Sequence, residues 1–170
     1  LHDKSNIPII LYNIPGRSII DVQTNTMKDL SKLSRIIGVK DATGDIGRVS
    51  DTRQECGKNF IQLCGNDEIA LGFNSHGGVG CISVIANVAP KISSDFQKFM
   101  LSGDYLSALK LQDKLLPLHR AAFIEPNPAP IKYGLKLLGF CNSDVRLPLT
   151  EITQESKQKI ENAMKFAGLI

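Results

Sequence analysis

Four short apolar segments recur in the first part of the chain, and each leads into a polar or glycine-rich stretch. Their starts are separated by 28, 24 and 20 residues, and they comprise Pro8–Tyr12, Ile36–Lys40, Phe60–Cys64 and Gly80–Val84. Helical periodicity lies between them, so each unit is typical of a strand followed by a helix. Short β-branched segments of this kind suit a parallel sheet that is covered by helices. The pattern predicts an α/β fold.

The remainder of the chain carries helical patterns without further strands. Asp104 and Thr153 each precede an apolar periodic segment, where an N-cap is expected. Four βα units are half of an eight-stranded TIM barrel, which typically takes about 250 residues. We therefore expect residues 1–100 to form half of a (β/α)8 barrel, with four parallel βα units, and residues 101–170 to form a C-terminal all-helical region.

Composition and charge narrow the class of protein. The chain has 170 residues, of which 42% are hydrophobic and 22% charged, with a formal net charge of +3. These values are ordinary for a globular domain and favour neither nucleic acid nor a membrane surface as a partner. Four cysteines occur without a C-x-x-C pair, which predicts reduced, buried thiols in a cytoplasmic protein and no metal site: Cys56, Cys64, Cys81 and Cys141.

Two candidate catalytic side chains stand at the ends of consecutive predicted strands. Tyr12 closes the first strand and Lys40 closes the second. In a TIM barrel, side chains at these ends face the mouth of the active site. Burial beside Ile36–Val39 would favour the neutral amine of Lys40, which imine chemistry with a ketone requires. From spacing alone, a solvent-facing Lys40 and a core Tyr12 remain open alternatives.

Two further segments could contact an anionic ligand. Arg17 follows Tyr12 on a turn that contains proline and glycine, where a guanidinium would suit a carboxylate, although an exposed loop arginine fits equally. Residues 77–80 (Gly-Gly-Val-Gly) resemble a phosphate-binding loop. They precede a strand instead of joining a strand to a helix, which argues against that interpretation.

Six motifs follow one another along almost the whole chain. They are residues 12–17 (Tyr-Asn-Ile-Pro-Gly-Arg), 38–44 (Gly-Val-Lys-Asp-Ala-Thr-Gly), 64–67 (Cys-Gly-Asn-Asp), 80–87 (Gly-Cys-Ile-Ser-Val-Ile-Ala-Asn), 125–132 (Glu-Pro-Asn-Pro-Ala-Pro-Ile-Lys) and 146–149 (Arg-Leu-Pro-Leu). In this order they resemble the dihydrodipicolinate synthase family. The presence of all six motifs in the family's order identifies the family far more specifically than any single motif does.

The resemblance implies a class I lyase that makes 4-hydroxy-tetrahydrodipicolinate from pyruvate and aspartate semialdehyde, in lysine and diaminopimelate biosynthesis. Lys40 matches the lysine that forms a covalent imine with pyruvate, and Tyr12 matches a proton-relaying tyrosine. Arg17 matches the arginine that holds the semialdehyde carboxylate. Gly65 and Ile82 match positions that line the pyruvate site. The resemblance implies neither a metal nor an organic cofactor.

The match corresponds to the C-terminal half of the family's barrel. The Gly-Thr-Thr-Gly-Glu stretch of the N-terminal half has no counterpart in this sequence. We therefore expect the missing N-terminal half of the barrel to be a partner, and a homo-oligomer to form. Two alternatives stay open. One is a related pyruvate-dependent sugar-acid aldolase such as N-acetylneuraminate lyase, and the other is a non-catalytic remnant.

Overall fold

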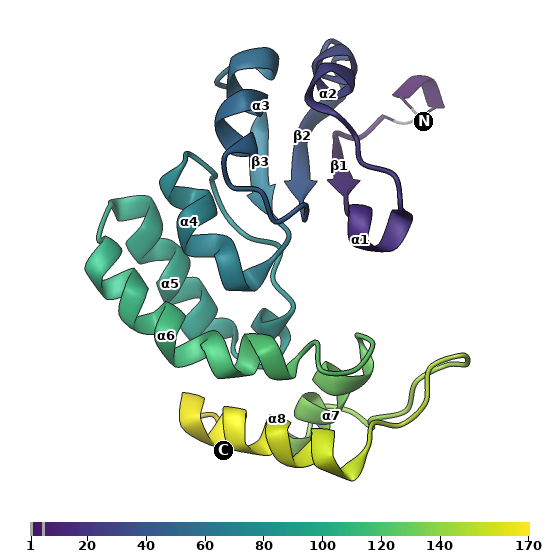
Figure 1. The fold of residues 1–170 in the computed structure, drawn as a ribbon, viewed down its shortest axis with the longest axis vertical. Coiled ribbons are helices and arrows are strands. Elements are labelled where there is room, and N and C mark those ends of the chain that lie inside the picture. The colour runs from purple at the N-terminus through teal and green to yellow at the C-terminus, as the bar shows by residue number, and fades with distance from the viewer. Residues whose placement is uncertain (1, 5) are drawn as a thin grey trace. The chain divides into compact units, whose positions relative to one another are not determined.

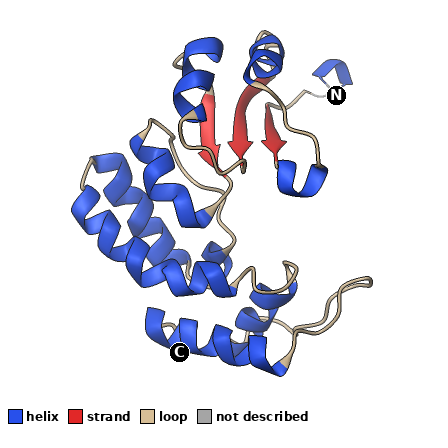
Figure 2. Cartoon of the chain, in the orientation of Figure 1, coloured by secondary structure: helices blue, strands red, loops and turns tan. Residues whose placement is uncertain are grey.

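The computed structural model describes residues 2–4 and 6–170 of the chain. It divides into two compact units, Leu1–Ile82 and Ser83–Ile170, which are described separately (Figure 1). The first unit contains the strands and the second is helical (Figure 2). The sequence predicted a different kind of boundary, at residue 100, between a half barrel and a C-terminal helical region. That boundary stays a prediction.

A three-stranded parallel sheet organises the first unit. Its strands β1 (Ile9–Asn13), β2 (Ile36–Asp41) and β3 (Ile61–Cys64) lie in the order β1-β2-β3. Four of the six strand ends lie one residue away from the ends of the predicted segments, and the other two coincide with them. All three arrowheads point to the same edge of the sheet in Figure 1, as parallel strands require. The predicted α/β class is confirmed.

The fourth predicted strand, Gly80–Val84, forms only an isolated parallel bridge between Cys64 and Cys81. The backbone amide of Cys64 donates to Gly80 at 2.8 Å, and that of Ile82 donates to Cys64 at 2.9 Å. The pairing stops because the Ser83 hydroxyl accepts from the amide of Ala86 at 2.9 Å and begins a 3₁₀ helix, Ile85–Asn87. The residues that the structure describes therefore do not confirm four complete βα units.

The first unit also contains short helices, one before β1 and the others after the strands. They are the 3₁₀ helix His2–Lys4, α1 (Pro15–Ser18), α2 (Thr24–Ser31), α3 (Arg48–Cys56), the 3₁₀ helix Asp67–Ile69 and α4 (Ala70–Ser75). Helices α2 and α3 pack against each other, and α2 also contacts β2. A small core lies between helix and sheet, where Met27, Val39 and Phe60 are buried.

The second unit is a cluster of four longer helices, α5 (Pro90–Ser102), α6 (Tyr105–Ala121), α7 (Ala129–Leu137) and α8 (Gln154–Ala167). Both predicted N-caps are confirmed. Asp104 accepts from the amide of Ser107 at 3.0 Å, and Thr153 accepts from that of Ser156 at 3.2 Å. Leu118 and Met164 are fully buried in the core where α6 and α8 pack together.

Candidate functional site

The structure brings Tyr12 and Lys40 into direct contact at the carboxyl edge of the sheet. The two residues are paired in the parallel register of β1 and β2. The Lys40 Nζ atom lies 3.9 Å from the centroid of the Tyr12 ring. Lys40 is half-buried, and Tyr12 is 51% exposed. An amine and a phenol therefore share one accessible surface.

Strand alternation separates these side chains from their neighbours in sequence. Lys40 and Asp41 point to opposite faces of the sheet, because successive side chains in a strand alternate. The face that carries Asp41 also carries Gln62, whose side-chain amide donates to Val49 of α3 at 3.0 Å. This face is covered by helix, whereas the face that carries Lys40 remains accessible.

A polar cluster occupies the covered face directly behind the candidate site. We call it the Arg48 cluster, and it comprises Asn13, Asp21, Asp41 and Arg48. The Arg48 Nη1 atom lies 2.8 Å from Asp21, its Nε atom lies 3.8 Å from Asp41, and its Nη2 donates to the Val22 carbonyl. Asn13 donates to Asp21 at 2.8 Å. One guanidinium therefore joins the ends of both strands that carry candidate catalytic residues.

In the Arg48 cluster one guanidinium faces two carboxylates, those of Asp21 and Asp41. The hydrogen bond from Arg48 lowers the pKa of Asp21, so this carboxylate stays ionised opposite the guanidinium. The Asp41 carboxylate accepts from the backbone amide of Thr43 at 2.8 Å and from its hydroxyl at 2.7 Å. These bonds fix the turn after Lys40. The contacts of Asp41 with Arg48 and with Thr43 thus anchor the backbone next to Lys40.

Gly65 and Ile82 lie at the same edge of the sheet. The Gly65 amide donates to the Asp41 carbonyl at 2.6 Å. A Cβ atom on Gly65 would lie 2.9 Å from both the Ala42 Cβ and the Asp41 carbonyl oxygen, so only glycine allows this approach. Ile82 is 45% exposed and is bonded through its amide to the Cys64 carbonyl. The turn after β3 therefore lies against the residue that follows Lys40.

Arg17 lies on α1, immediately after β1. It is exposed, and its guanidinium has no hydrogen-bond or ion-pair partner among the residues that the structure describes. The short helix spans Pro15–Ser18 and is followed by Ile19, whose φ of 65° lies in the left-handed region. The structure therefore presents Arg17 beside the end of β1 without a protein contact that defines its position.

The Arg48 cluster is the part of the site that the sequence interpretation missed. A signal was present, because Asn13 and Asp41 each follow a candidate catalytic residue directly, at positions that alternation assigns to the covered face. A polar side chain there needs a buried partner. The identity of that partner was not readable, since Asp21 and Arg48 are 27 residues apart in the chain.

The four cysteines are free thiols, but their burial differs from the prediction. Cys64 is buried, Cys56 and Cys81 are partly exposed, and Cys141 is exposed. Cys141 lies beyond α7, where residues 139–142 are all exposed, which is why its thiol reaches solvent. The prediction of buried thiols is therefore confirmed for Cys64, is met only in part at Cys56 and Cys81, and is wrong for Cys141.

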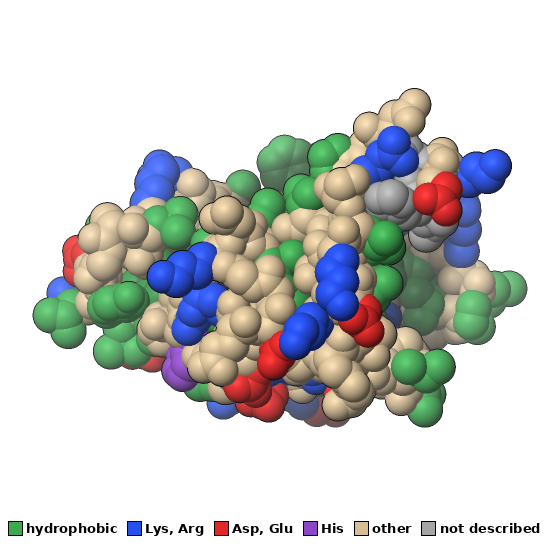
Figure 3. Space-filling model, turned by 90° about the horizontal axis from the view of Figure 1, so that it is seen from above, with side chains coloured by type: hydrophobic (Ala, Val, Ile, Leu, Met, Phe, Trp, Pro, Cys, Tyr) green, Lys and Arg blue, Asp and Glu red, His purple; other side chains and the backbone are tan. Residues whose placement is uncertain are grey.

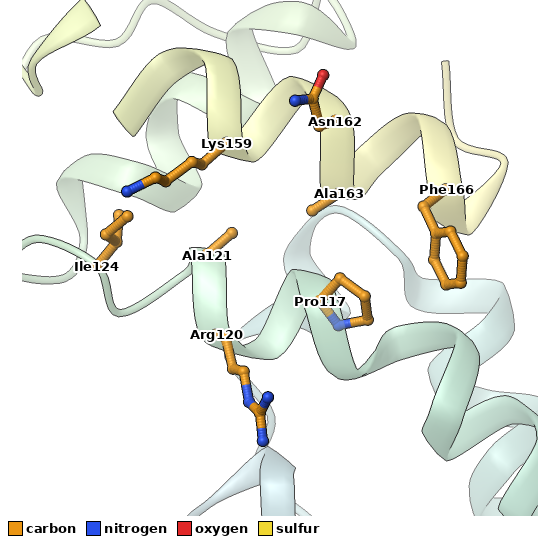
Figure 4. A pocket seen from close by; sticks show the side chains of 8 residues that line it. All are labelled: Pro117, Arg120, Ala121, Ile124, Lys159, Asn162, Ala163 and Phe166. Atoms are coloured by element: carbon orange, nitrogen blue, oxygen red, sulfur yellow. The ribbon is translucent and has the colours of Figure 1, made fainter. Parts of the chain in front are cut away.

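A cavity of about 510 Å³ lies in the second unit, between α6 and α8. In Figure 4, Pro117 and Arg120 line it from α6, and Lys159 and Phe166 line it from α8. The Lys159 ammonium pairs with Glu155 at 2.6 Å. The cavity contains none of the predicted site residues, so the edge of the sheet in the first unit remains the candidate site.

Comparison with known proteins decides the family. Residues 2–167 match the model of the dihydrodipicolinate synthetase family. The chain belongs to this family. Over its 170 residues it is 58% identical to the 4-hydroxy-tetrahydrodipicolinate synthase of Ruegeria pomeroyi and 57% identical to that of Cereibacter sphaeroides. In both alignments all of this chain is covered, but only 59% of the relative, so the chain spans little more than half the length of these relatives.

Solved structures of the family agree with the fold. The dihydrodipicolinate synthase of Acinetobacter baumannii, solved with pyruvate, matches with a TM-score of 0.94 and 36% identity, covering 99% of this chain and 58% of that one. A monomeric dihydrodipicolinate synthase variant matches with a TM-score of 0.95 and 32% identity, with the same coverage. The parallel sheet and its helices therefore belong to the TIM-barrel fold of this family.

Charges of both signs are mixed on the surface, and the length and character of the helices bear on whether they could span a membrane. On the face drawn in Figure 3, acidic and basic side chains lie next to one another, and ion pairs such as Lys28–Glu55 at 2.6 Å occur in the first unit. Among the described residues, no helix combines the length and the apolar character that crossing a membrane demands.

Proposed function

We propose that the protein is a 4-hydroxy-tetrahydrodipicolinate synthase, which condenses pyruvate with aspartate semialdehyde through an imine on Lys40. The observation that carries this proposal is the contact between Lys40 and Tyr12 at the carboxyl edge of the sheet, 3.9 Å from amine to ring centroid. This edge is where TIM-barrel enzymes place their catalytic groups. The proposal is supported by relatives of that name with identities up to 58%.

In the proposed first step, the neutral amine of Lys40 attacks the ketone carbon of pyruvate. The carbonyl oxygen leaves as water, and a covalent imine forms. Tyr12, whose ring contacts the amine, is the nearest phenol to supply and recover protons in this step. Loss of a proton from the pyruvate methyl group then gives an enamine, and its carbon attacks the aldehyde carbon of the second substrate. The C=O π bond opens, and the aldehyde oxygen takes up a proton to become a hydroxyl. The imine acts as the electron sink, so we propose no metal or organic cofactor.

We assign Arg17 to the second substrate and Gly65 and Ile82 to the first. The exposed guanidinium of Arg17 stands on α1 beside the end of β1 and suits a carboxylate. Gly65 and Ile82 stand at the edge that carries Lys40, and Gly65 bonds directly to the residue after it. A short carboxylated aldehyde is therefore the expected substrate, in preference to a polyhydroxylated sugar acid.

The proposal extends to assembly. A closed barrel leaves no sheet edge, whereas β1 in the described part of the chain pairs on one side only, with β2. We propose that the N-terminal half of the barrel pairs there, and that the complete protein forms a homo-oligomer. Sedimentation of the chain with and without an added N-terminal half tests both points. A stable monomeric chain that gains nothing from the added half would contradict them.

Borohydride trapping tests the chemistry. Incubation of the protein, completed with the N-terminal half of the barrel, with pyruvate and borohydride should reduce the imine and add one pyruvate to Lys40, located by peptide mass. Lys40→Ala should abolish the adduct, and Lys40→Arg should abolish it as well, because a guanidinium stays protonated and does not attack. Lys58→Ala, at an exposed lysine, is the matched control and should trap normally. An adduct that survives Lys40→Ala would refute the assignment.

A further inference from the structure

The two cysteines nearest the candidate site stand opposite each other across a parallel bridge. Cys64 ends β3, and Cys81 is its bridge partner. The hydrogen bonds on either side, from Cys64 to Gly80 at 2.8 Å and from Ile82 to Cys64 at 2.9 Å, fix this register. Paired residues in a parallel bridge place their side chains on the same face of the sheet. The two thiols therefore have no element between them.

The separation suits a covalent link. Neighbouring strands lie about 4.8 Å apart, which falls within the range of about 4.4–6.8 Å between the Cα atoms of disulfide-bonded cysteines. The interaction between the two thiols lowers the pKa of Cys64 and raises that of Cys81, while the Cys64 thiol donates to the Asn66 carbonyl at 3.1 Å and the Cys81 thiol to the Asp67 carboxylate at 3.6 Å. Cys64 is fully buried, whereas Cys81 is partly exposed, which gives a small oxidant a path to the pair.

We propose that Cys64 and Cys81 form an oxidisable dithiol site, which hydrogen peroxide converts to an intramolecular disulfide. One thiol of the pair, as its thiolate, attacks one oxygen of the peroxide, the O–O bond breaks, and the departing hydroxide takes up the proton that this thiol released to become water. The sulfur of the other cysteine then attacks the sulfur of the resulting sulfenic acid. The S–O bond breaks, and the second hydroxide leaves as water with the proton of the second thiol. Two thiols are oxidised to one disulfide while one peroxide is reduced to two waters.

The disulfide would act on the candidate site through the backbone. Gly65 and Ile82 each follow one of the two cysteines, and the sulfurs must move from non-bonded contact to about 2.05 Å. Gly65 has no room to shift toward β2, because its amide already lies 2.6 Å from the Asp41 carbonyl. We therefore expect the oxidised protein to trap pyruvate several-fold less well. This second step rests on the proposed function, whereas formation of the disulfide does not.

The chain is well suited to a direct test. No lysine or arginine lies between Lys58 and Lys91, so trypsin releases both cysteines in one peptide, residues 59–91. The experiment uses a Cys56→Ala/Cys141→Ser background, in which only the pair remains. After mild hydrogen peroxide treatment and alkylation, this peptide should be lighter than its reduced form by two hydrogen atoms and carry no alkyl group. Dithiothreitol should restore alkylation at both cysteines.

Two controls distinguish the steps. Cys81→Ser in the same background should give no disulfide, and its pyruvate trapping should not fall with peroxide. The same peptide is also mapped in the unsubstituted protein, so that the disulfide can still be detected if a variant folds poorly. Alkylation of both thiols after peroxide, or oxidation that stops at sulfinic acid, would overturn the dithiol site. A disulfide that leaves trapping unchanged would overturn its effect on the site. Reduced protein that never traps pyruvate, even with the N-terminal half added, would refute the proposed function, whereas a disulfide detected by peptide mass would still support the dithiol site.

Discussion

The Lys40 amine lies over the ring of Tyr12, 3.9 Å from its centroid, and the two residues are register partners in neighbouring parallel strands. Register fixes this contact, because it places both side chains on the same face at the same height of the sheet. A cation over an aromatic face gains roughly 0.5–1 kcal/mol at an exposed site. Tyr12 therefore has two separable properties, a ring that contacts the amine and a hydroxyl that can move protons.

Substitution at Tyr12 separates these properties. Tyr12→Phe keeps the ring and removes the hydroxyl, so the rate of pyruvate imine formation should fall by about 10²- to 10⁴-fold while the protein remains folded. The measurement is the rate of borohydride-trapped adduct formation. Tyr105→Phe, at an exposed tyrosine of α6, is the matched control. A Tyr12→Phe variant that traps at the normal rate would remove Tyr12 from the proton relay.

Arg17→Ala should weaken use of the semialdehyde far more than use of pyruvate. Loss of a charge-assisted bond to a carboxylate costs roughly 1.5–3 kcal/mol, which is about 10- to 100-fold in kcat/KM. Steady-state kinetics with each substrate varied in turn give the two values. Lys32→Ala, at an exposed lysine of the same unit, should change neither. Equal losses for both substrates would indicate a structural role for Arg17.

Gly65→Ala should destabilise the first unit. The added Cβ would lie 2.9 Å from the Asp41 carbonyl oxygen, which is backbone and cannot rotate away. Overpacking of this kind lowers the free energy of unfolding by about 1–3 kcal/mol. Gly72→Ala in α4 is the control, because its Cβ would meet Ile46 no closer than 3.4 Å. Equal stability of the two variants in urea unfolding would contradict the close approach at Gly65.

Asp21 gives the Arg48 cluster a defined pH dependence. Its pKa is lowered from 3.8, chiefly by the hydrogen bond from Arg48, so the bond stabilises the folded state fully above pH 3.8. That stabilisation is lost as the pH falls through the lower folded value. Asp21→Asn should therefore reduce the free energy of unfolding by roughly 1.5–3 kcal/mol at neutral pH, and by progressively less in acid.

The matched control for Asp21 is Asp29→Asn. Asp29 pairs with Lys32 at 2.7 Å, but both side chains are well exposed, so its loss should change stability little at any pH. Urea unfolding measured at several pH values compares the two variants. An Asp21→Asn deficit that stays constant from neutral to acid pH would show that ionisation of Asp21 contributes nothing to the cluster.

Much of the fold was readable from local pattern. Apolar β-branched segments located β1, β2 and β3, because buried parallel strands need continuous apolar residues. The caps at Asp104 and Thr153 were readable as well, since a cap is a contact between residues only three positions apart. The segment around Gly80–Val84 looked equally strand-like. The Ser83 hydroxyl, which begins the next turn, gave it a different structure.

The candidate site was only partly readable. Strand ends placed Tyr12 and Lys40 at one edge, but their contact depends on a register that includes an irregularity between Ile9 and Ile10. The Arg48 cluster depends on where the loop that carries Asp21 meets the start of α3, and no local pattern determines that. Long-range contacts between polar side chains are set by tertiary structure, so sequence spacing alone could not reveal them.

The alternation of side chains along β2 has a consequence for redesign of this protein. Lys40 and Asp41 are adjacent in the chain, yet one belongs to the accessible face and the other to the Arg48 cluster on the covered face. Mutational libraries aimed at new substrates can therefore vary the accessible face while the anchoring cluster is held constant. A single-residue deletion within β2 would place Lys40 on the covered face and Asp41 on the accessible face. Such libraries should therefore be restricted to substitutions.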